Sequence, residues 1–442
     1  MADSIKKIVI IGAGFTGLTA GLELVKMGIN VTILEKDSDV GGLAGSFSVG
    51  GKQKLEKFYH HWFTNDEHIM ALIHELGLEN KIRINETSTG MYFANRFYKL
   101  SAPADLLMFS PIPFLARIRV GIGVLAVRLI KNWKKLEKKS ASSWLKSVFG
   151  EKAYQVMWEP LLKGKFGRYS DDVSAVWFWN KLKLRGGSRN QKGKEALAYF
   201  EGGFGALADF IAAEITRLGG KINLGSEVTS IQKSESSGFQ ISYSSDQIIS
   251  SDTILFTTPI PIVTHLGKSL FKADYLASLQ QIKYIGNVCL VLILDRSLSE
   301  TYWLNVNDPD FPFVGVIEHT NFENREAYAG NHIVYLSKYL PADEPLYTMT
   351  DDQFLNFSVP FIQRMFPTFS TEWIRQYFVW RSPYSQPLVT KGYSEIIPDL
   401  KTPVEGVYLS TMAQIYPEDR GTNYAVREGK KIAGLIKSEL SC

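Results

Sequence analysis

Cysteine is nearly absent from this chain of 442 residues, which contains only Cys289 and Cys442. Two cysteines provide neither a disulfide framework nor a cysteine-rich metal cluster. We therefore expect no metal site and a reducing compartment, the cytoplasm.

Nucleic-acid-binding features are also missing, because no block of lysine and arginine is interleaved with aromatic residues. Internal repeats and low-complexity segments are absent. The net charge of +4 and the 21% of charged residues permit an anionic ligand or membrane surface without requiring one. The length suits two or three domains.

A long uninterrupted hydrophobic run is lacking too. Residues 106–130 are apolar, but prolines and arginines exclude a spanning helix: Pro111, Pro113, Arg117, Arg119 and Arg128. We interpret the segment as a mostly buried helical region. The alternative is a surface helix that dips into lipid, with downstream lysines at the headgroups and peripheral contact of residues 106–139 with the inner membrane face.

The N-terminus carries a strong structural pattern. Residues 8–11 form a short β-branched run typical of a buried strand. Apolar residues recur at helical spacing over 15–27, Gly28 is a natural C-cap, and 31–34 form a second strand. Together they predict a right-handed βαβ unit.

A glycine motif opens the helix of this unit: Gly12-Ala13-Gly14-Phe15-Thr16-Gly17. In a GxGxxG turn the glycines allow a tight turn, close approach of a pyrophosphate, and close packing of helix on strand. The helix N-terminus offers free N–H groups to phosphates. Glu35, followed by Lys36, ends the second strand, where a carboxylate can accept ribose hydroxyls. The unit therefore predicts a dinucleotide site.

A second glycine turn follows Glu35, with the sequence Gly41-Gly42-Leu43-Ala44-Gly45. Such a turn lets the backbone pass close to an extended FAD; the alternative is an ordinary flexible loop. No second GxGxxG follows a strand, so we expect no NAD(P)H domain. Electrons would then leave through oxygen, a quinone or another carrier.

These features resemble a known superfamily. The fingerprint, Glu35, the Gly-Gly turn and a C-terminal strand, loop and helix resemble flavin-dependent amine oxidases, protoporphyrinogen oxidases, phytoene desaturases and UDP-galactopyranose mutases. The likeness is greatest to poorly characterised prokaryotic oxidoreductases. It implies an α/β, two-domain fold: a Rossmann-type FAD-binding domain (1–90, 195–261 and 400–442) and an inserted substrate domain of mixed sheet and helices (91–194 and 262–399).

The resemblance also implies residue roles. Non-covalent FAD would meet the two glycine turns, Glu35 and the backbone of Val228, and then the segments that flank the flavin. The implied set is Gly12, Ala13, Gly14, Phe15, Thr16, Gly17, Glu35, Lys36, Gly41, Gly42, Leu43, Ala44, Tyr59, His60, Val228, Arg420, Thr422, Asn423 and Tyr424. Thr422 and Asn423 are good N-cap types for a helix over 424–440.

Two aromatic segments supply candidate active-site residues. In residues 58–63, His60 and His61 are catalytic candidates and Trp62 a substrate contact; aromatic packing is the alternative. In residues 380–387, Arg381 and Tyr384 are substrate contacts and Tyr384 also a catalytic candidate, with a structural loop as the alternative. Adjacent histidines point apart, which disfavours a metal.

The sequence departs from the superfamily at two positions. Thr411-Met412 stand where relatives usually carry Gly-Asp, and Cys289 stands near the place of a lysine found in many amine oxidases. The missing lysine argues against ordinary amine oxidation. We interpret Cys289 as a small buried residue.

Three hypotheses follow. The first is an FAD-dependent oxidoreductase that removes hydride equivalents from a small or lipid-like substrate. The second is a non-redox sugar-nucleotide mutase, motivated by the paired histidines and Arg325. The third is a non-catalytic flavin-bound scaffold or lipid-binding protein at a membrane.

Overall fold

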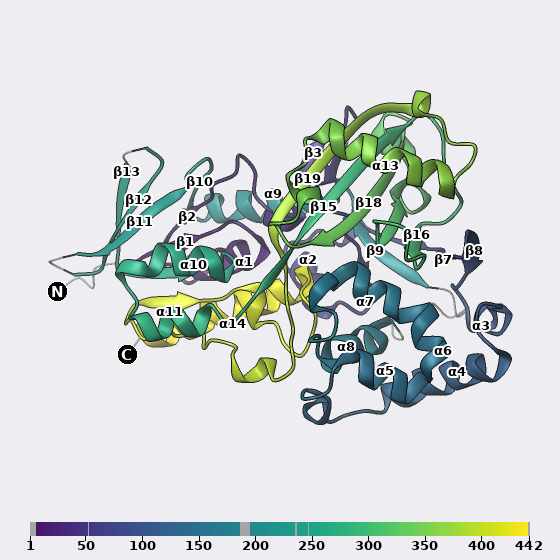
Figure 1. Cartoon of the computed structure of the whole chain (residues 1–442). Helices are drawn as coiled ribbons and strands as arrows, with labels where there is room; N and C mark the ends of the chain where they lie inside the picture. Colours follow the sequence, from purple (N-terminus) through teal and green to yellow (C-terminus); the bar gives the residue numbers. More distant parts are fainter. Residues whose placement is uncertain (1–5, 52, 186–194, 235–236, 246, 441–442) are drawn as a thin grey trace.

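The computed structural model describes residues 6–51, 53–185, 195–234, 237–245 and 247–440, so Cys442 lies outside the described residues. Figure 1 shows a nucleotide-binding domain on the left and a second domain, with a large sheet above a group of helices, on the right. The fold class predicted from the sequence is confirmed: a Rossmann-type domain joined to a domain of mixed sheet and helices.

The first domain is built on a parallel five-stranded sheet with the order β10-β2-β1-β14-β20. Its central strand carries the N-terminal apolar run, and Ile8 lies between Val31 and Thr253. The five strands are β1 (Lys7–Ile11), β2 (Asn30–Leu34), β10 (Lys221–Asn223), β14 (Thr253–Phe256) and β20 (Val407–Leu409). Distant segments thus complete the N-terminal βαβ unit.

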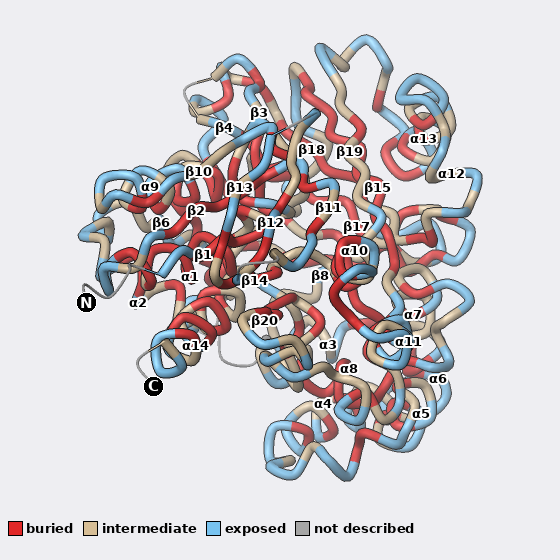
Figure 2. The backbone as a smooth tube through the Cα atoms, turned by 90° about the vertical axis from the view of Figure 1, so that its left-hand side faces the viewer, coloured by how far each residue is buried: buried red, intermediate tan, exposed pale blue. Residues whose placement is uncertain are grey.

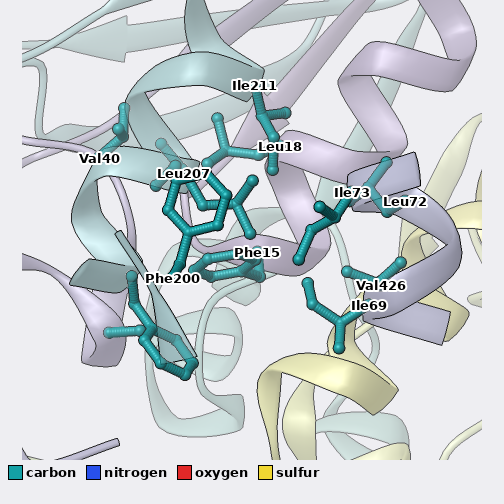
Figure 3. Close-up of a cluster of buried hydrophobic side chains, with 14 of the residues drawn as sticks. Phe15, Leu18, Val40, Ile69, Leu72, Ile73, Phe200, Leu207, Ile211 and Val426 are labelled. Atoms are coloured by element: carbon teal, nitrogen blue, oxygen red, sulfur yellow. The ribbon is translucent and has the colours of Figure 1, made fainter. Parts of the chain in front are cut away.

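Alternating side chains of β1 enter two different cores. Ile8 and Ile10 belong to the cluster that contains the helices on one face of the sheet: α1 (Phe15–Lys26), α2 (Glu67–Glu75), α9 (Gly203–Arg217) and α14 (Thr422–Leu440). Figure 3 shows this cluster, with side chains from all four helices converging. This two-sided burial explains why the strand is continuously hydrophobic.

The other face of the sheet is covered by a meander and two helices. Val9 and Ile11 belong to this second core. Its elements are β11 (Val228–Lys233), β12 (Phe239–Tyr243), β13 (Gln247–Ser251), α10 (Ile260–Leu266) and α11 (Ala273–Leu279). Strand β13 is largely exposed, and of its residues only Ser251 is buried.

The second domain contains a seven-stranded mixed sheet with the order β19-β15-β18-β17-β16-β7-β8. Strand β15 is buried along its whole length except at Tyr284, and it pairs antiparallel with both β18 and β19. The strands are β7 (Thr89–Phe93), β8 (Arg96–Lys99), β15 (Tyr284–Leu294), β16 (Trp303–Val306), β17 (Gly315–Glu318), β18 (His332–Leu340) and β19 (Ile374–Pro387); the helices that follow β18 are α12 (Pro345–Thr348) and α13 (Asp351–Met365).

Six helices form the rest of this domain: α3 (Pro103–Met108), α4 (Phe114–Arg128), α5 (Ala141–Phe149), α6 (Glu151–Ala153), α7 (Glu159–Phe166) and α8 (Ala175–Arg185). The interpretation of residues 106–130 as mostly buried is wrong. Only a narrow stripe of α4 (Val120, Gly123 and Val127) is buried, because one helix packed at the edge of a group can bury only one side. Figure 2 shows α4 at the periphery. Within the described ranges, no helix is long and apolar enough to cross a membrane.

Two small sheets join the domains: β3 (Ser46–Ser48) with β4 (Lys54–Glu56), and β5 (Trp62–Phe63), β9 (Ala196–Phe200) and β6 (Ile82–Glu86). Glu56 ends β4 and is completely buried. Its carboxyl accepts hydrogen bonds from the Tyr199 hydroxyl, at 2.7 and 2.8 Å, and from the backbone N–H of Phe204 at 2.6 Å. Burial raises the pKa of Glu56 to about 7.

This buried carboxyl predicts a pH-dependent stability. Because the folded-state pKa exceeds the unfolded value, the contribution of Glu56 is greatest below pH 4.5 and falls as the pH rises through about 7. Glu56→Gln mimics the protonated form and removes this titration. We expect the unfolding free energy of wild type relative to Glu56→Gln to fall by about 2–3 kcal/mol between pH 4.5 and 8, measured by urea denaturation. A pH-independent difference between the two proteins would contradict this.

Candidate functional site

The two glycine turns are joined to each other. The backbone N–H of Gly41 donates to the Ala13 carbonyl at 2.9 Å, and Gly14 and Gly41 form a parallel bridge. Gly41 has a φ of 109°, a conformation that other residues rarely adopt. The two turns, which α1 and β2 separate along the chain, therefore form one surface.

Gly14 and Gly17 of the first turn differ in the space around them. A Cβ on Gly17 would lie 2.1 Å from the Gly12 carbonyl oxygen, so Gly17 is required for the close packing of α1 on the turn. A Cβ on Gly14 would meet nothing within 4 Å. Gly14 is the N-cap of α1 and has no capping side chain. Open space beside the free N–H groups of a helix N-terminus suits a pyrophosphate.

Glu35 lies beside this turn and is buried. Its carboxylate oxygens accept the backbone N–H groups of Ala13 at 2.7 Å and Asp37 at 3.0 Å. Burial raises the pKa of Glu35, and these two hydrogen bonds oppose the rise. Each carboxylate oxygen has a second lone pair, so Glu35 retains capacity for ribose hydroxyls. The exposed Lys36 follows it.

Val228 is brought to the same place by the turn that precedes β11. The backbone N–H of Ser226 donates to the Glu35 carbonyl at 2.7 Å, and that of Gly225 donates to the Asp37 carbonyl at 2.9 Å. The open glycine, the acidic residue and this third segment form a cradle that fits the adenosine diphosphate half of a dinucleotide.

A cavity of about 380 Å³ lies next to the second glycine turn, between the two domains. Nine residues that the sequence suggested line it: Leu43, Tyr59, His60, His61, Trp62, Arg420, Thr422, Asn423 and Tyr424. The other walls come from the second domain and are mostly aromatic or aliphatic, with members that include Trp158, Leu162, Trp177, Phe178, Trp303 and Tyr339. Such a lining suits a flat or apolar ligand.

The two histidines have different partners. The Nδ1 of His60 donates to the Phe58 carbonyl at 2.6 Å, and burial lowers the pKa of His60 to about 4, so the ring is neutral at pH 7. The Nδ1 of His61 lies 3.0 Å from the Tyr302 hydroxyl. The ring of Trp62 lies against Phe204, with centroids 4.1 Å apart.

The final helix begins two residues earlier than predicted, at Thr422, so Thr422 and Asn423 are not its N-cap. The Thr422 hydroxyl accepts the indole N–H of Trp62 at 2.7 Å. The Asn423 amide oxygen accepts the backbone N–H groups of His68 and Ile69, and thereby caps α2 instead. Nearby, Thr411 caps a short 3-10 helix by accepting the N–H of Ala413.

Other predicted residues lie away from the cavity lining. The Arg381 guanidinium donates to Asp351 and to the carbonyls of Met349 and Tyr347, which hold it at α12 and α13, and it does not line this cavity. Tyr384 lies against Tyr284 and is also outside the lining.

Two further predictions have clear outcomes. Arg325 is exposed on a short 3-10 helix beside Glu326 and His332, and it does not line the cavity. Cys289 is completely buried in β15, as predicted, and burial raises the pKa of its thiol.

A group of three charged residues and a tryptophan at the helical wall of the cavity was not predicted from the sequence. It consists of Lys165 on α7, Trp177 and Lys181 on α8, and Asp419. The Asp419 carboxylate is buried, and it accepts the Trp177 indole N–H at 2.9 Å and pairs with Lys181 at 2.5 Å. Asp419 lies beside Arg420, which the resemblance suggested, but nothing in the spacing links it to Trp177, 242 positions earlier.

Comparison with known proteins identifies the class. The profile of the family "Flavin containing amine oxidoreductase" matches residues 15–436, and the chain belongs to this family. The protein is therefore a flavin-dependent oxidoreductase.

Individual relatives are distant. The 15-cis-phytoene desaturase of an Oncidium hybrid cultivar is 23% identical over 438 residues, covering 91% of this chain and 73% of the relative. A structure from Exiguobacterium sp. 255-15, assigned provisionally as a protoporphyrinogen oxidase, has a TM-score of 0.77 at 18% identity, covering 99% of both chains. Reduced UDP-galactopyranose mutase has a TM-score of 0.75 at 15% identity, covering 98% of this chain and 94% of the other. These two structures are similar in fold.

Substitutions of Gly14 and Gly17 in the first turn should have different effects on stability and on flavin binding. Gly14→Ala adds a methyl group in open space, so we expect unfolding free energy to change by less than about 1 kcal/mol while flavin affinity falls at least tenfold. Gly17→Ala forces a clash with backbone and should destabilise the protein by about 3 kcal/mol. Chemical denaturation and flavin titration measure both quantities. Equal effects of the two substitutions on stability would contradict the assigned roles.

Proposed function

We propose that the flavin is FAD, bound non-covalently, and that the protein removes hydride equivalents from a small or lipid-like substrate. The carrying observation is the joined pair of glycine turns, which continues from the dinucleotide cradle directly into the aromatic cavity. An extended cofactor with an adenosine half and a flavin half matches this continuity; a mononucleotide would leave the cradle at Glu35 without a ligand.

Different residues would hold different parts of the cofactor. Gly14 and the N-terminus of α1 receive the pyrophosphate, and Glu35 receives the ribose. Leu43, Tyr59, His60 and the segment 420–424 border the space for the flavin ring. When bound, FAD supplies the acceptor for a hydride equivalent. The unsatisfied N–H groups at the start of α14 stabilise negative charge nearby.

His60, His61 and Trp62 also line the cavity and would contact a substrate there. The neutral His60 offers an acceptor nitrogen, His61 is held by Tyr302, and Trp62 contributes an apolar surface. Together with the aromatic walls they orient an apolar molecule and exclude water. The relatives' names mention phytoene and protoporphyrinogen, which are consistent with such a substrate. Oxygen, a quinone or another carrier takes up the electrons.

The mutase hypothesis has lost one of its two supports. Arg325, the basic residue that motivated this hypothesis, does not line the cavity, whereas the paired histidines do. The likeness to the mutase structure is one of fold at 15% identity. Oxidation of a substrate by the flavin is the function that the cavity supports better.

The cofactor proposal predicts a direct result. Purified protein should absorb near 450 nm, and acid precipitation should release all of the flavin into the supernatant, where chromatography identifies it as FAD. Flavin that stays with the precipitate would contradict non-covalent binding, and released FMN would contradict FAD. Protein that contains no flavin and binds no added FAD would overturn the proposed function as a whole.

We also propose that the helical part of the second domain contacts a membrane surface. One face of α3 and α4 exposes a stripe of large apolar side chains, with Leu115 78% and Ile122 64% exposed: Leu107, Met108, Phe114, Leu115, Ile118, Ile122, Leu125 and Leu129. The spacing of 3 and 4 residues from Leu115 onwards places them on one side of the helix. An apolar stripe of this size is unusual for a surface that faces only water.

The charges beside this stripe favour an anionic lipid surface as its partner. Six exposed cations follow it: Arg128, Lys131, Lys134, Lys135, Lys138 and Lys139. Among the described residues none of the six forms an ion pair. The single carboxylate of residues 128–139, Glu137, is buried and accepts hydrogen bonds from Ser394 and Tyr416. Apolar side chains flanked by cations match the interface of a bilayer that contains acidic lipids.

Vesicle binding tests this contact. Full-length protein should co-sediment with phosphatidylglycerol vesicles, and Ile122→Glu with Leu125→Glu should reduce the binding at least tenfold. Ile248→Glu, which alters an equally exposed residue on β13, is the matched control and should bind as wild type. Replacement of Lys131, Lys134 and Lys135 by Gln should remove the preference for anionic over neutral vesicles. Wild-type protein that stays in the supernatant would refute the contact.

A further inference from the structure

One wall of the cavity concentrates positive charge. Lys165 from α7, Lys181 from α8 and Arg420 from the loop before α14 all line the cavity. A single carboxylate, Asp419, acts on Lys165, together with the like charges of Lys181 and Arg420. The wall therefore has more cationic than anionic groups.

The oxygen atoms of the Asp419 carboxylate already accept hydrogen bonds and an ion pair from other residues. One carboxylate oxygen accepts the Trp177 indole N–H at 2.9 Å and the Gln386 amide at 3.1 Å, and the other pairs with Lys181 at 2.5 Å. These cations and donors hold the pKa of Asp419 well below its usual range. Asp419 thus neutralises Lys181 and leaves Lys165 without a carboxylate of its own.

Lys165 has an unusual environment for an ammonium group. Its Nζ lies over three aromatic rings, 4.8 Å from the centroids of Trp177 and Tyr339 and 5.6 Å from that of Phe166. Among the described residues it has no hydrogen-bond or ion-pair partner. Burial lowers the pKa of Lys165 well below its ordinary value, because the charged form is poorly solvated there. Rings alone compensate little of that cost.

Arg420 faces the same space with spare donors. Its Nε donates to the Gln386 side chain at 3.1 Å and one terminal nitrogen donates to the Tyr339 hydroxyl at 3.2 Å. The guanidinium has five N–H donors, so several remain. The other carboxylates of the lining belong to segments before α2 and β9, where Asp66 accepts the Phe63 N–H and Glu195 accepts the Thr89 hydroxyl.

We infer that Lys165 and Arg420 form an oxyanion subsite that binds the carboxylate or phosphate group of an otherwise apolar substrate. The inference rests on the proposed function, which it narrows to amphipathic acids. The body of such a molecule lies against the apolar lining of α7 and α8, which includes Leu162, Phe178 and Leu182. An anion supplies the partner that Lys165 lacks, and a charge-assisted hydrogen bond in a dry pocket is strong.

A pair of isosteric ligands tests the subsite without knowledge of the substrate. Decanoate and decanamide differ in charge and share the apolar chain; decyl phosphate distinguishes the two oxyanions. We expect FAD-loaded enzyme to bind decanoate at least tenfold more tightly than decanamide, measured by calorimetry and by the shift of the flavin absorption band. If decanoate binds more tightly than decyl phosphate, the subsite prefers a carboxylate, and if decyl phosphate binds more tightly, it prefers a phosphate. Equal affinity for acid and amide would overturn the subsite.

Variants assign the effect to particular residues. Lys165→Gln and Arg420→Gln should each weaken decanoate binding at least tenfold and leave decanamide unchanged. Lys163→Gln is the matched control, since Lys163 is exposed on the same helix and pairs with Glu159. Decanoate binding that survives Lys165→Gln would refute the assignment.

Two measurements keep the test independent of flavin binding. Thermal-shift titration with decanoate uses the protein with or without FAD, so failure to bind flavin would overturn the proposed function and leave the subsite testable. Lys165→Met should raise the melting temperature, because it removes a half-buried amine that has no hydrogen-bond or ion-pair partner among the described residues. A lower melting temperature for Lys165→Met would show that Lys165 is satisfied within the fold and would count against the subsite.

Discussion

The buried carboxylate of Asp419 is the interaction on which the geometry of the site depends. Removing an ionised carboxylate from water is costly unless charges and donors surround it. Its partners are supplied by α8 and β19 of the second domain, whereas Asp419 itself precedes α14 of the nucleotide-binding domain. The charged form is therefore satisfied only when the two domains are assembled, and this assembly fixes the loop that carries Arg420 and the start of α14.

The nucleotide cradle follows from a more local constraint, which is steric. Two glycine turns approach so closely that the Gly41 amide bonds to the Ala13 carbonyl, and a side chain at Gly17 would overlap the backbone. Short-range spacing encodes these contacts, since strand, glycines, helix and acidic residue lie within the first 35 residues. The βαβ unit, the second turn and the position of Glu35 could therefore be predicted from the sequence.

The substrate side of the site could not be predicted in the same way. Lys165, Lys181 and Asp419 come together through packing of α7 and α8 against a loop far along the chain, and no periodicity relates them. Arg381 illustrates the converse: an arginine among aromatics resembles a ligand contact, and in the fold Asp351 and two carbonyls accept its hydrogen bonds. Asn423 is a residue type that often caps helices, but in the tertiary structure it caps α2 and not the helix to which it belongs. In both cases the residue type predicted which hydrogen bonds the side chain can form, but only the tertiary structure determines with which partner it forms them.

The helical part of the second domain links the two surfaces that concern the substrate. Helix α4 packs on α5, α6 and α8 and turns its apolar face outward, while α7 and α8 turn aromatic and cationic side chains into the cavity. An amphipathic acid has both properties that these surfaces select, because its chain partitions into lipid and its head group binds cations. A freely soluble amine would need neither the exposed apolar face of α4 nor the cationic wall of the cavity. Positive charge on Lys165 and Arg420 would repel a protonated amine. The oxyanion subsite proposed for Lys165 and Arg420 would therefore favour an acid over a protonated amine as the substrate.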